Sequence, residues 1–122
     1  MRELNTIQKT NKLNKVEAVD DKGVGNANHK YKITSLPNET QGGFTDYISF
    51  QKGARKDPNA VDGILDEDLL EIVRDRLIGF QSGDFATKEN KLALRHIEDA
   101  LFWLNKRKED RVKRGVLGTY DK

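Results

Sequence analysis

The chain has 122 residues, of which 35% are hydrophobic and 34% are charged, and 22 Lys and Arg against 20 Asp and Glu give a net charge of +2. This length is typical of one domain, and so small a net charge does not by itself indicate nucleic-acid binding. The absence of cysteine excludes thiol nucleophiles, disulfides and cysteine-ligated metal sites. No apolar stretch reaches the roughly 18 residues of a membrane span, and the N-terminal residues lack the apolar run of a secretory signal, so we expect an intracellular protein that does not enter a membrane.

The N-terminal residues 1–15 are rich in Asn, Lys and Thr, with only scattered Leu and Ile. Such a composition does not offset the entropy lost on ordering the chain, which predicts a flexible arm. We expect residues 16–122 to form a single ligand-binding domain.

The first predicted elements are strands. Residues 16–19 alternate weakly and predict a short strand, and residues 30–35 alternate between apolar or aromatic and basic side chains. Residues 47–50 are β-branched or aromatic around Ser49 and predict the partner strand. The loop Pro37–Gly43 would join the two as an antiparallel hairpin, which needs further packing to be stable.

Two helices follow a connecting loop at residues 51–65. Leucine, valine and phenylalanine recur at three- and four-residue spacing from an acidic start, which predicts a helix over residues 66–81. Ser82-Gly83-Asp84 ends this helix, and the Thr87 hydroxyl is suited to cap a second one over residues 88–114.

The second predicted helix carries an apolar seam, so the two helices should pack as a hairpin. Its residues are Ala93, Ile97, Ala100, Leu101 and Leu104. The predicted fold class is therefore α+β, with a small antiparallel β-sheet in about residues 16–55 followed by a long C-terminal α-helical hairpin in about 66–114. This second helix would span about 40 Å at about 1.5 Å per residue, more than a domain of this size needs. Together with the low apolar content, this predicts a homodimer or a higher homo-oligomer.

The end of the second helix carries Arg107, Arg111 and Arg114 at spacings that place all three on one helical face. A guanidinium offers a planar donor fork that matches two phosphate oxygens, so this face predicts a phosphate-binding site. Trp103 and His96 continue the same stripe and supply aromatic and polar surface. The alternative is a solvated basic helix end that complements the helix dipole.

An aromatic ring and an amide lie near the helix turn, at Phe80 and Asn90. Stacking on an aromatic ring together with amide hydrogen bonds is a common way to hold a nucleotide base. The alternatives are burial of Phe80 in the hairpin core and an ordinary exposed first-turn position for Asn90.

Catalytic machinery is not evident. Neither His29 nor His96 has metal-ligand spacing, no serine has a nucleophile-elbow setting, and the glycine turn fits no phosphate-loop motif. We therefore predict no catalytic residues, no metal and no cofactor. A hydrolase with His29 or His96 as general base stays open as an alternative.

Several motifs together resemble the phage Thoeris anti-defence sponge family, which is related through its C-terminal helical hairpin to sponges that counter cyclic-oligonucleotide defence. The resemblance covers roughly residues 16–119. It rests on Gly25-Asn26-Ala27-Asn28-His29-Lys30-Tyr31, Phe50-Gln51-Lys52-Gly53, Gly79-Phe80-Gln81-Ser82-Gly83, Ala100-Leu101-Phe102-Trp103-Leu104, and the tail from Arg107 through Arg111 and Arg114-Gly115-Val116-Leu117-Gly118-Thr119.

This resemblance implies a non-catalytic protein that sequesters glycocyclic ADP-ribose made by TIR-domain enzymes, in the cytoplasm of an infected or lysogenic bacterium. It implies that Phe80 and Asn90 contact the adenine side and that Arg107 and Arg111 grip the diphosphate. Some relatives also bind cyclic di- or trinucleotides at a second site, for which Arg114, Gly118 and Thr119 are the candidates here. The alternative function is a nucleic-acid-binding phage regulator that uses the same basic helix, although nucleic acid is the less favoured partner.

Overall fold

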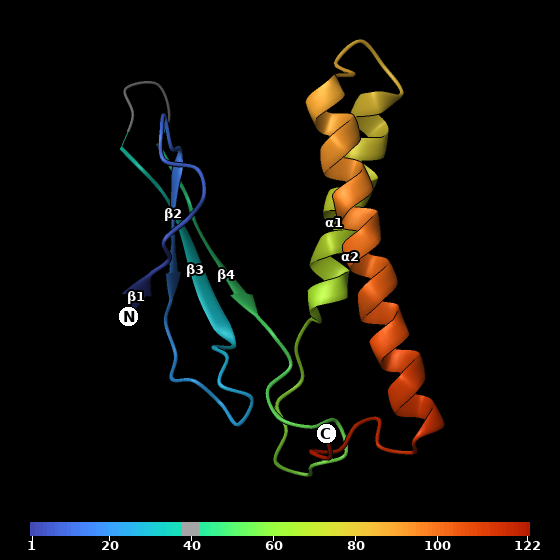
Figure 1. Cartoon of the computed structure of the whole chain (residues 1–122). Coiled ribbons are helices and arrows are strands. Elements are labelled where there is room, and N and C mark those ends of the chain that lie inside the picture. Colours follow the sequence, from blue (N-terminus) through green and yellow to red (C-terminus); the bar gives the residue numbers. More distant parts are fainter. Residues whose placement is uncertain (38–41) are drawn as a thin grey trace. The chain divides into compact units, whose positions relative to one another are not determined.

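The computed structural model describes residues 1–37 and 42–122 of the chain (Figure 1). It divides into two compact units. The first consists of Met1–Gly53 and Asn59–Ile64, and the second of Ala54–Pro58 and Leu65–Lys122. Residues 38–41 of the predicted loop Pro37–Gly43 lie outside the described residues.

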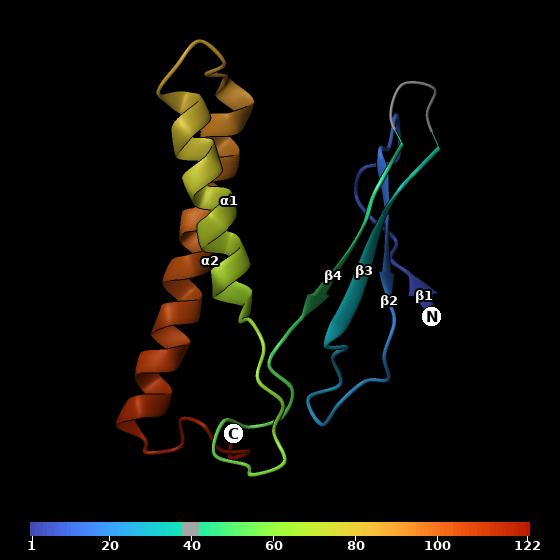
Figure 2. The ribbon, with the colours of Figure 1, turned by 180° about the vertical axis from the view of Figure 1, so that it is seen from behind.

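The first unit is built on a four-stranded antiparallel sheet with the order β1-β2-β3-β4 (Figure 2). The strands are β1 (Arg2–Glu3), β2 (Asn14–Ala18), β3 (Lys30–Ser35) and β4 (Thr45–Ser49). The two strands predicted around Ile33 and Ile48 pair as the expected hairpin, and the sheet ahead of two helices confirms the α+β fold class.

One face of the sheet is apolar because alternate side chains point to the same side. Ala18 is opposite Tyr31, which is opposite Ile48 on the next strand. Phe50 packs edge-on against Tyr31, with 5.8 Å between the ring centroids. Ala18 is 2% exposed and is the one buried apolar residue among those that the structure describes. The core of this unit is therefore small.

The first residues of the N-terminal arm pair with the sheet. Arg2 and Glu3 pair with β2, and the Leu4 amide donates a 2.9 Å hydrogen bond to the Val16 carbonyl. An edge strand offers unpaired backbone groups that can bind any chain, so composition alone does not reveal such a contact. Residues 5–13 form no strand or helix.

The predicted connecting loop at 51–65 is more ordered than its sequence indicates. Lys52 and Val61 exchange two backbone hydrogen bonds of 2.9 and 2.8 Å, and Phe50 forms a bridge with Ile64. A Cβ at Gly63 would lie 2.4 Å from the Phe50 carbonyl carbon, so this close approach requires glycine.

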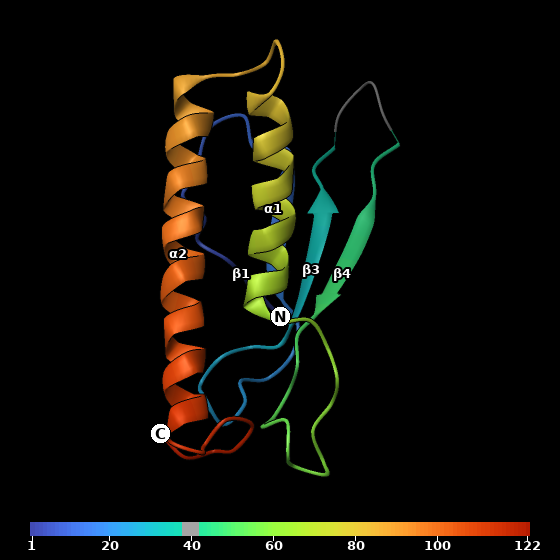
Figure 3. The same cartoon turned by 90° about the vertical axis from the view of Figure 1, so that its right-hand side faces the viewer.

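The second unit is a helical hairpin of α1 (Asp66–Gln81) and α2 (Lys88–Lys113), and these bounds match the predicted helices closely. The helices run antiparallel and side by side (Figure 3). The Asp68 carboxylate accepts a 2.9 Å hydrogen bond from the Leu65 amide at the start of α1. The Thr87 hydroxyl accepts a 3.0 Å bond from the Asn90 amide, which confirms the predicted cap of α2.

The seam between the helices follows three- and four-residue spacing for most of its length. The half-buried residues of α2 are Asn90, Leu94, Ile97, Ala100, Leu101 and Leu104, and those of α1 are Glu67, Leu69, Leu70, Arg74, Leu77 and Gln81. The predicted seam was wrong at Ala93, which is exposed, because the spacing selects Leu94 instead. Arg74 Nε donates a 2.9 Å bond to Glu98 across the seam.

Large apolar side chains remain exposed on both helices. They include Ile72, Val73, Phe80, Leu92, Phe102 and Trp103. Neither helix, nor any other among the described residues, is both long and apolar enough to cross a membrane.

Candidate functional site

The tip of the hairpin, residues 80–90, brings together two of the predicted ligand-binding residues. Gln81 and Thr87 close this turn through a pair of side-chain-to-backbone hydrogen bonds of 3.0 and 2.9 Å. These two hydrogen bonds join the end of α1, where Phe80 lies, to the start of α2, where Asn90 lies. Phe80 is 43% exposed, which argues against its burial in the hairpin core.

A cation that the residue pattern did not indicate as a site residue lies beside Phe80. The Arg76 guanidinium sits over the Phe80 ring, with 5.5 Å from Cζ to the ring centroid. The four-residue spacing on one helix face is the signal that could have revealed this pair. An aromatic face and a positive charge therefore occur together at the tip, which suits a base attached to a phosphate.

The opposite end of the hairpin, its base, carries the three predicted arginines in three different settings. Arg107 is exposed and makes no hydrogen bond or ion pair with any residue that the structure describes. Its donors are available to a ligand. Arg114 instead pairs with Asp110 at 3.0 Å, and it also donates to the Lys122 carbonyl.

Arg111 is only 9% exposed, unlike the exposed Arg107 and Arg114. Its guanidinium donates to the backbone carbonyls of Asp121, Val116 and Thr119 at 2.9, 3.0 and 3.2 Å. Sequence spacing places Arg111 on the arginine face, but it does not show that the following tail folds back onto that face.

The last two predicted residues lie in this tail. Gly118 has a φ of +79°, a conformation that favours glycine, and its carbonyl accepts a 2.9 Å bond from the Lys56 amide. The Thr119 hydroxyl donates to the Val116 carbonyl at 2.6 Å. Both residues take part in the turn structure of the tail.

The tip and the base are too far apart to contact one small ligand within a single chain. At about 1.5 Å per residue, Asn90 and Arg107 lie about 25 Å apart along α2. A compact cyclic nucleotide does not bridge that distance. The structure therefore places Phe80 and Asn90 at one end of the hairpin, and it places Arg107, Arg111, Arg114, Gly118 and Thr119 at the other.

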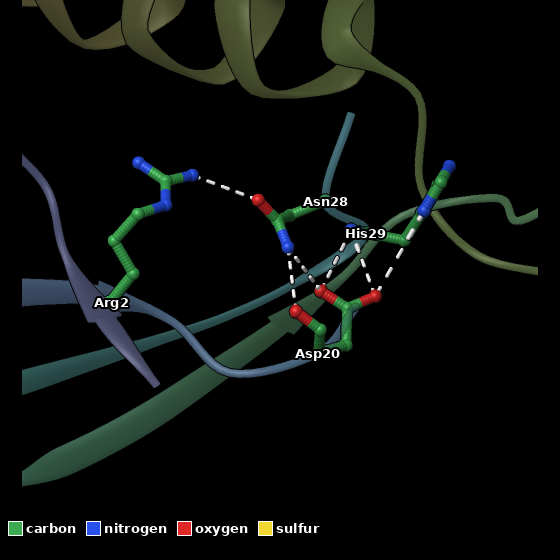
Figure 4. Close-up of polar contacts among 4 residues, drawn as sticks. All are labelled: Arg2, Asp20, Asn28 and His29. Atoms are coloured by element: carbon green, nitrogen blue, oxygen red, sulfur yellow. Dashed lines mark hydrogen bonds and ion pairs between the residues drawn. The ribbon is translucent and has the colours of Figure 1, made fainter. Parts of the chain in front are cut away.

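A separate polar cluster surrounds His29, the candidate general base of the hydrolase alternative (Figure 4). The Asp20 carboxylate accepts hydrogen bonds from the His29 amide at 3.1 and 3.0 Å and from the Asn28 side chain at 3.3 Å. Arg2 donates to Asn28 at 2.8 Å. These bonds close the loop between β2 and β3, which is a structural role.

The His29 ring is not oriented by a hydrogen bond to the nearby carboxylate. Its Nδ1 atom lies 3.9 Å from Asp20 Oδ2, beyond hydrogen-bond distance, and has no hydrogen-bond partner among the described residues. A Cβ at Gly23 would lie 2.6 Å from His29 Cε1, so the imidazole packs directly on this glycine.

The surroundings of the Asp20 carboxyl lower its pKa. Burial favours its neutral form, but hydrogen bonds from the Lys30 and His29 backbone and from Asn28 outweigh that effect and lower the pKa of Asp20 below its ordinary value. Asp20 therefore stays ionised and holds the loop. Within residues 1–37 and 42–122 no group of three or more His, Asp or Glu side chains is arranged to hold a metal ion.

The helical hairpin and its preceding strand define the class of the protein. Residues 45–109 match the family described as Acb2/Tad1, hairpin domain, and the chain belongs to this family. It is also similar to "Thoeris anti-defense 1" of Bacillus phage SBSphiJ7, with 43% identity over 75 residues. That alignment covers 62% of this chain and 52% of the phage protein, so the matched region spans about half the length of that relative.

Proposed function

We propose that this protein is a phage anti-defence protein that binds a cyclic ADP-ribose signal, glycocyclic ADP-ribose, in the host cytoplasm and sequesters it without transforming it. The membership in the Acb2/Tad1 hairpin family and the similarity to a phage Thoeris anti-defence protein carry this proposal. The exposed aromatic ring of Phe80 and the available guanidinium of Arg107 supply complementary chemistry for a base and a phosphate.

The binding site in this proposal is shared between two copies of the chain. Phe80, Asn90 and Arg76 of one protomer would hold the base, and Arg107 of its partner would hold the diphosphate. The distance of about 25 Å between the tip and the base of one hairpin supports a site that two chains complete together.

Helix geometry supports such a pairing. Successive residues of an α-helix are rotated by about 100° about the helix axis. By this rotation, Phe80 is turned about 90° away from the side of α1 that faces α2. Arg107 is turned about 90° away from the side of α2 that faces α1, in the same rotational sense. In antiparallel helices these rotations point to the same side of the hairpin. Two hairpins packed head to tail on this side would place the tip of each beside the base of the other.

The same side of α2 also carries apolar surface that a partner could cover. Trp103 is 66% exposed and lies one turn before Arg107. Covering exposed aromatic surface stabilises an association by about 25 cal/mol per Å². The small core of the single chain makes this contribution significant for its stability.

The decisive experiment distinguishes sequestration from destruction. The protein is incubated with signal made by a TIR-domain enzyme, small molecules are removed by filtration, and the retained complex is heat-denatured. Sequestration predicts that intact signal is released, which mass spectrometry would detect. Cleaved product would support the hydrolase alternative, and signal in the first filtrate would show that the protein does not bind it.

The Arg107→Ala variant is the matched negative control, and Lys113→Ala is the matched neutral change on the same helix. Cyclic di- and trinucleotides are tested in the same assay for the second site proposed at Arg114, Gly118 and Thr119. A DNA duplex tests the regulator alternative, for which affinity should fall steeply with salt.

A further inference from the structure

The α1 side of the hairpin tip carries a cation whose charge no described residue neutralises. Arg76 lies one turn before Phe80, and its guanidinium sits over the Phe80 ring. Two residues earlier, Arg74 engages the carboxylates of Glu71 and Glu98 at 3.5 and 2.9 Å. Arg76 makes no hydrogen bond or ion pair with any residue that the structure describes. Its donors are therefore available to an anion from outside the chain.

The contact between Arg76 and Phe80 leaves surface of both side chains open to a ligand. A guanidinium that lies over an aromatic ring keeps the N–H donors on its edge free to bind oxygen atoms. Phe80 remains 43% exposed although Arg76 lies over its ring. One base can therefore stack on the open part of the ring while a phosphate attached to it meets the edge of the guanidinium.

We propose that Arg76 is a specificity-determining residue that makes the tip favour a base carrying a phosphate over a neutral nucleoside. This inference rests on the proposed function, because it takes Phe80 as the ring that holds the base. The ring alone stacks on any base, charged or neutral, since stacking does not depend on an attached phosphate. The charge-assisted pair between the guanidinium and a phosphate forms only with the charged ligand, so Arg76 provides the discrimination.

The test compares adenosine monophosphate with adenosine, which differ only in the phosphate. Every protein in this comparison carries Arg107→Ala, so that Arg107 of a second copy cannot supply the same contact. The NMR shifts of the Phe80 ring report binding at the tip. We expect Arg76→Gln to weaken binding of adenosine monophosphate roughly tenfold and to leave binding of adenosine within about twofold of its original value. Arg76→Lys keeps the charge and should retain most of the preference.

Arg95→Gln is the matched control. Arg95 is an exposed arginine of α2 that also makes no hydrogen bond or ion pair with a described residue. At about 100° per residue, it is turned away from the side of the hairpin that carries Phe80. This variant should leave the affinities for both compounds unchanged.

Three outcomes would overturn the proposal. An equal loss for both compounds in Arg76→Gln would mean that Arg76 only positions the Phe80 ring. An unchanged affinity for adenosine monophosphate in this variant would show that Arg76 does not contact the phosphate. The third is that neither compound shifts the Phe80 ring. Failure of the proposed function is a separate result. If the unmodified protein retained no TIR-derived signal on filtration, but its preference for the phosphate depended on Arg76, the proposed function would fail and this inference would stand.

Discussion

The side-chain amide of Gln81 and the backbone of Thr87 bind each other in both directions, donating at 3.0 Å and accepting at 2.9 Å. This reciprocal pair fixes the turn between α1 and α2. It also sets the positions of the neighbouring residues proposed to hold the base, so the stability of the turn and ligand binding should depend on the same contact.

We expect Gln81→Leu, which keeps the size of the side chain and removes both bonds, to lower the free energy of unfolding by about 1 to 3 kcal/mol. Urea denaturation followed by circular dichroism measures this change. Ser82→Ala is the control, because the Ser82 hydroxyl donates to the Gly79 carbonyl within the same helix end and does not reach across the turn to any described residue. Equal stability of Gln81→Leu and the unmodified protein would contradict this role for Gln81.

The cap of α2 gives a second stability prediction. Thr87→Ala removes the hydroxyl that accepts from the Asn90 amide, and such a loss costs about 0.5 to 2 kcal/mol. Thr87→Ser keeps the acceptor and should retain most of the stability. Thermal unfolding of the two variants side by side decides the matter, and an equal loss in both would mean that the methyl group matters rather than the cap.

For ligand binding we expect Arg107→Ala to reduce affinity for the signal by roughly tenfold to over a hundredfold, because one charge-assisted contact contributes about 1.5 to 3 kcal/mol. Its thermal stability should change little, since Arg107 is exposed and makes no hydrogen bond or ion pair with a described residue. Lys113→Ala is the control on the same helix. Unchanged affinity on titration calorimetry would show that Arg107 does not contact the phosphate.

Association of the chain can be followed with its own chromophore, because Trp103 is the single tryptophan and is largely exposed in one copy. We expect emission at high protein concentration to lie at shorter wavelength than at high dilution, where the protomers separate. Light scattering gives the mass at each concentration. A particle of 13.9 kDa throughout, with constant emission, would rule out the shared site.

The Asp20 loop predicts a dependence of stability on acid. Because the pKa of Asp20 is lower in the folded protein than in the unfolded chain, its ionised form stabilises the fold above the unfolded pKa of about 3.9. This contribution is lost as the pH falls through the folded pKa. Asp20→Asn should therefore be less stable than the unmodified protein at pH 7, and the difference should shrink below about pH 4. A difference that stays constant with pH would exclude the carboxylate as its cause.

The sequence predicts the regular elements well because their signals are local. Alternation around Ile33 and the capped, three- and four-residue spacing after Thr87 depend only on neighbouring side chains. The strand pairing of Arg2 with β2 and the backbone hydrogen bond from Lys56 to Gly118 join residues far apart in the chain. No periodic pattern in the sequence encodes these contacts.

The candidate binding site also depends on long-range contacts that the sequence pattern does not encode. Exposure of Phe80 and Arg107 leaves both side chains accessible for the roles proposed for them. Arg111 has the same spacing as its neighbours but lies under a folded tail, and this difference comes from tertiary structure. Residue spacing locates a helical face, and only the fold shows which side chains on that face are free.

The tip and the base of one hairpin lie about 25 Å apart, so the amount of signal that the protein captures would depend on its concentration in the cell. If complete sites exist only in associated chains, a cell that holds few copies captures almost no signal, and capture rises more steeply than copy number as the protein accumulates. The signal in turn draws chains together, since a ligand that binds only the assembled form stabilises that form. The timing of expression during infection, and not affinity alone, would then decide whether the defence is silenced.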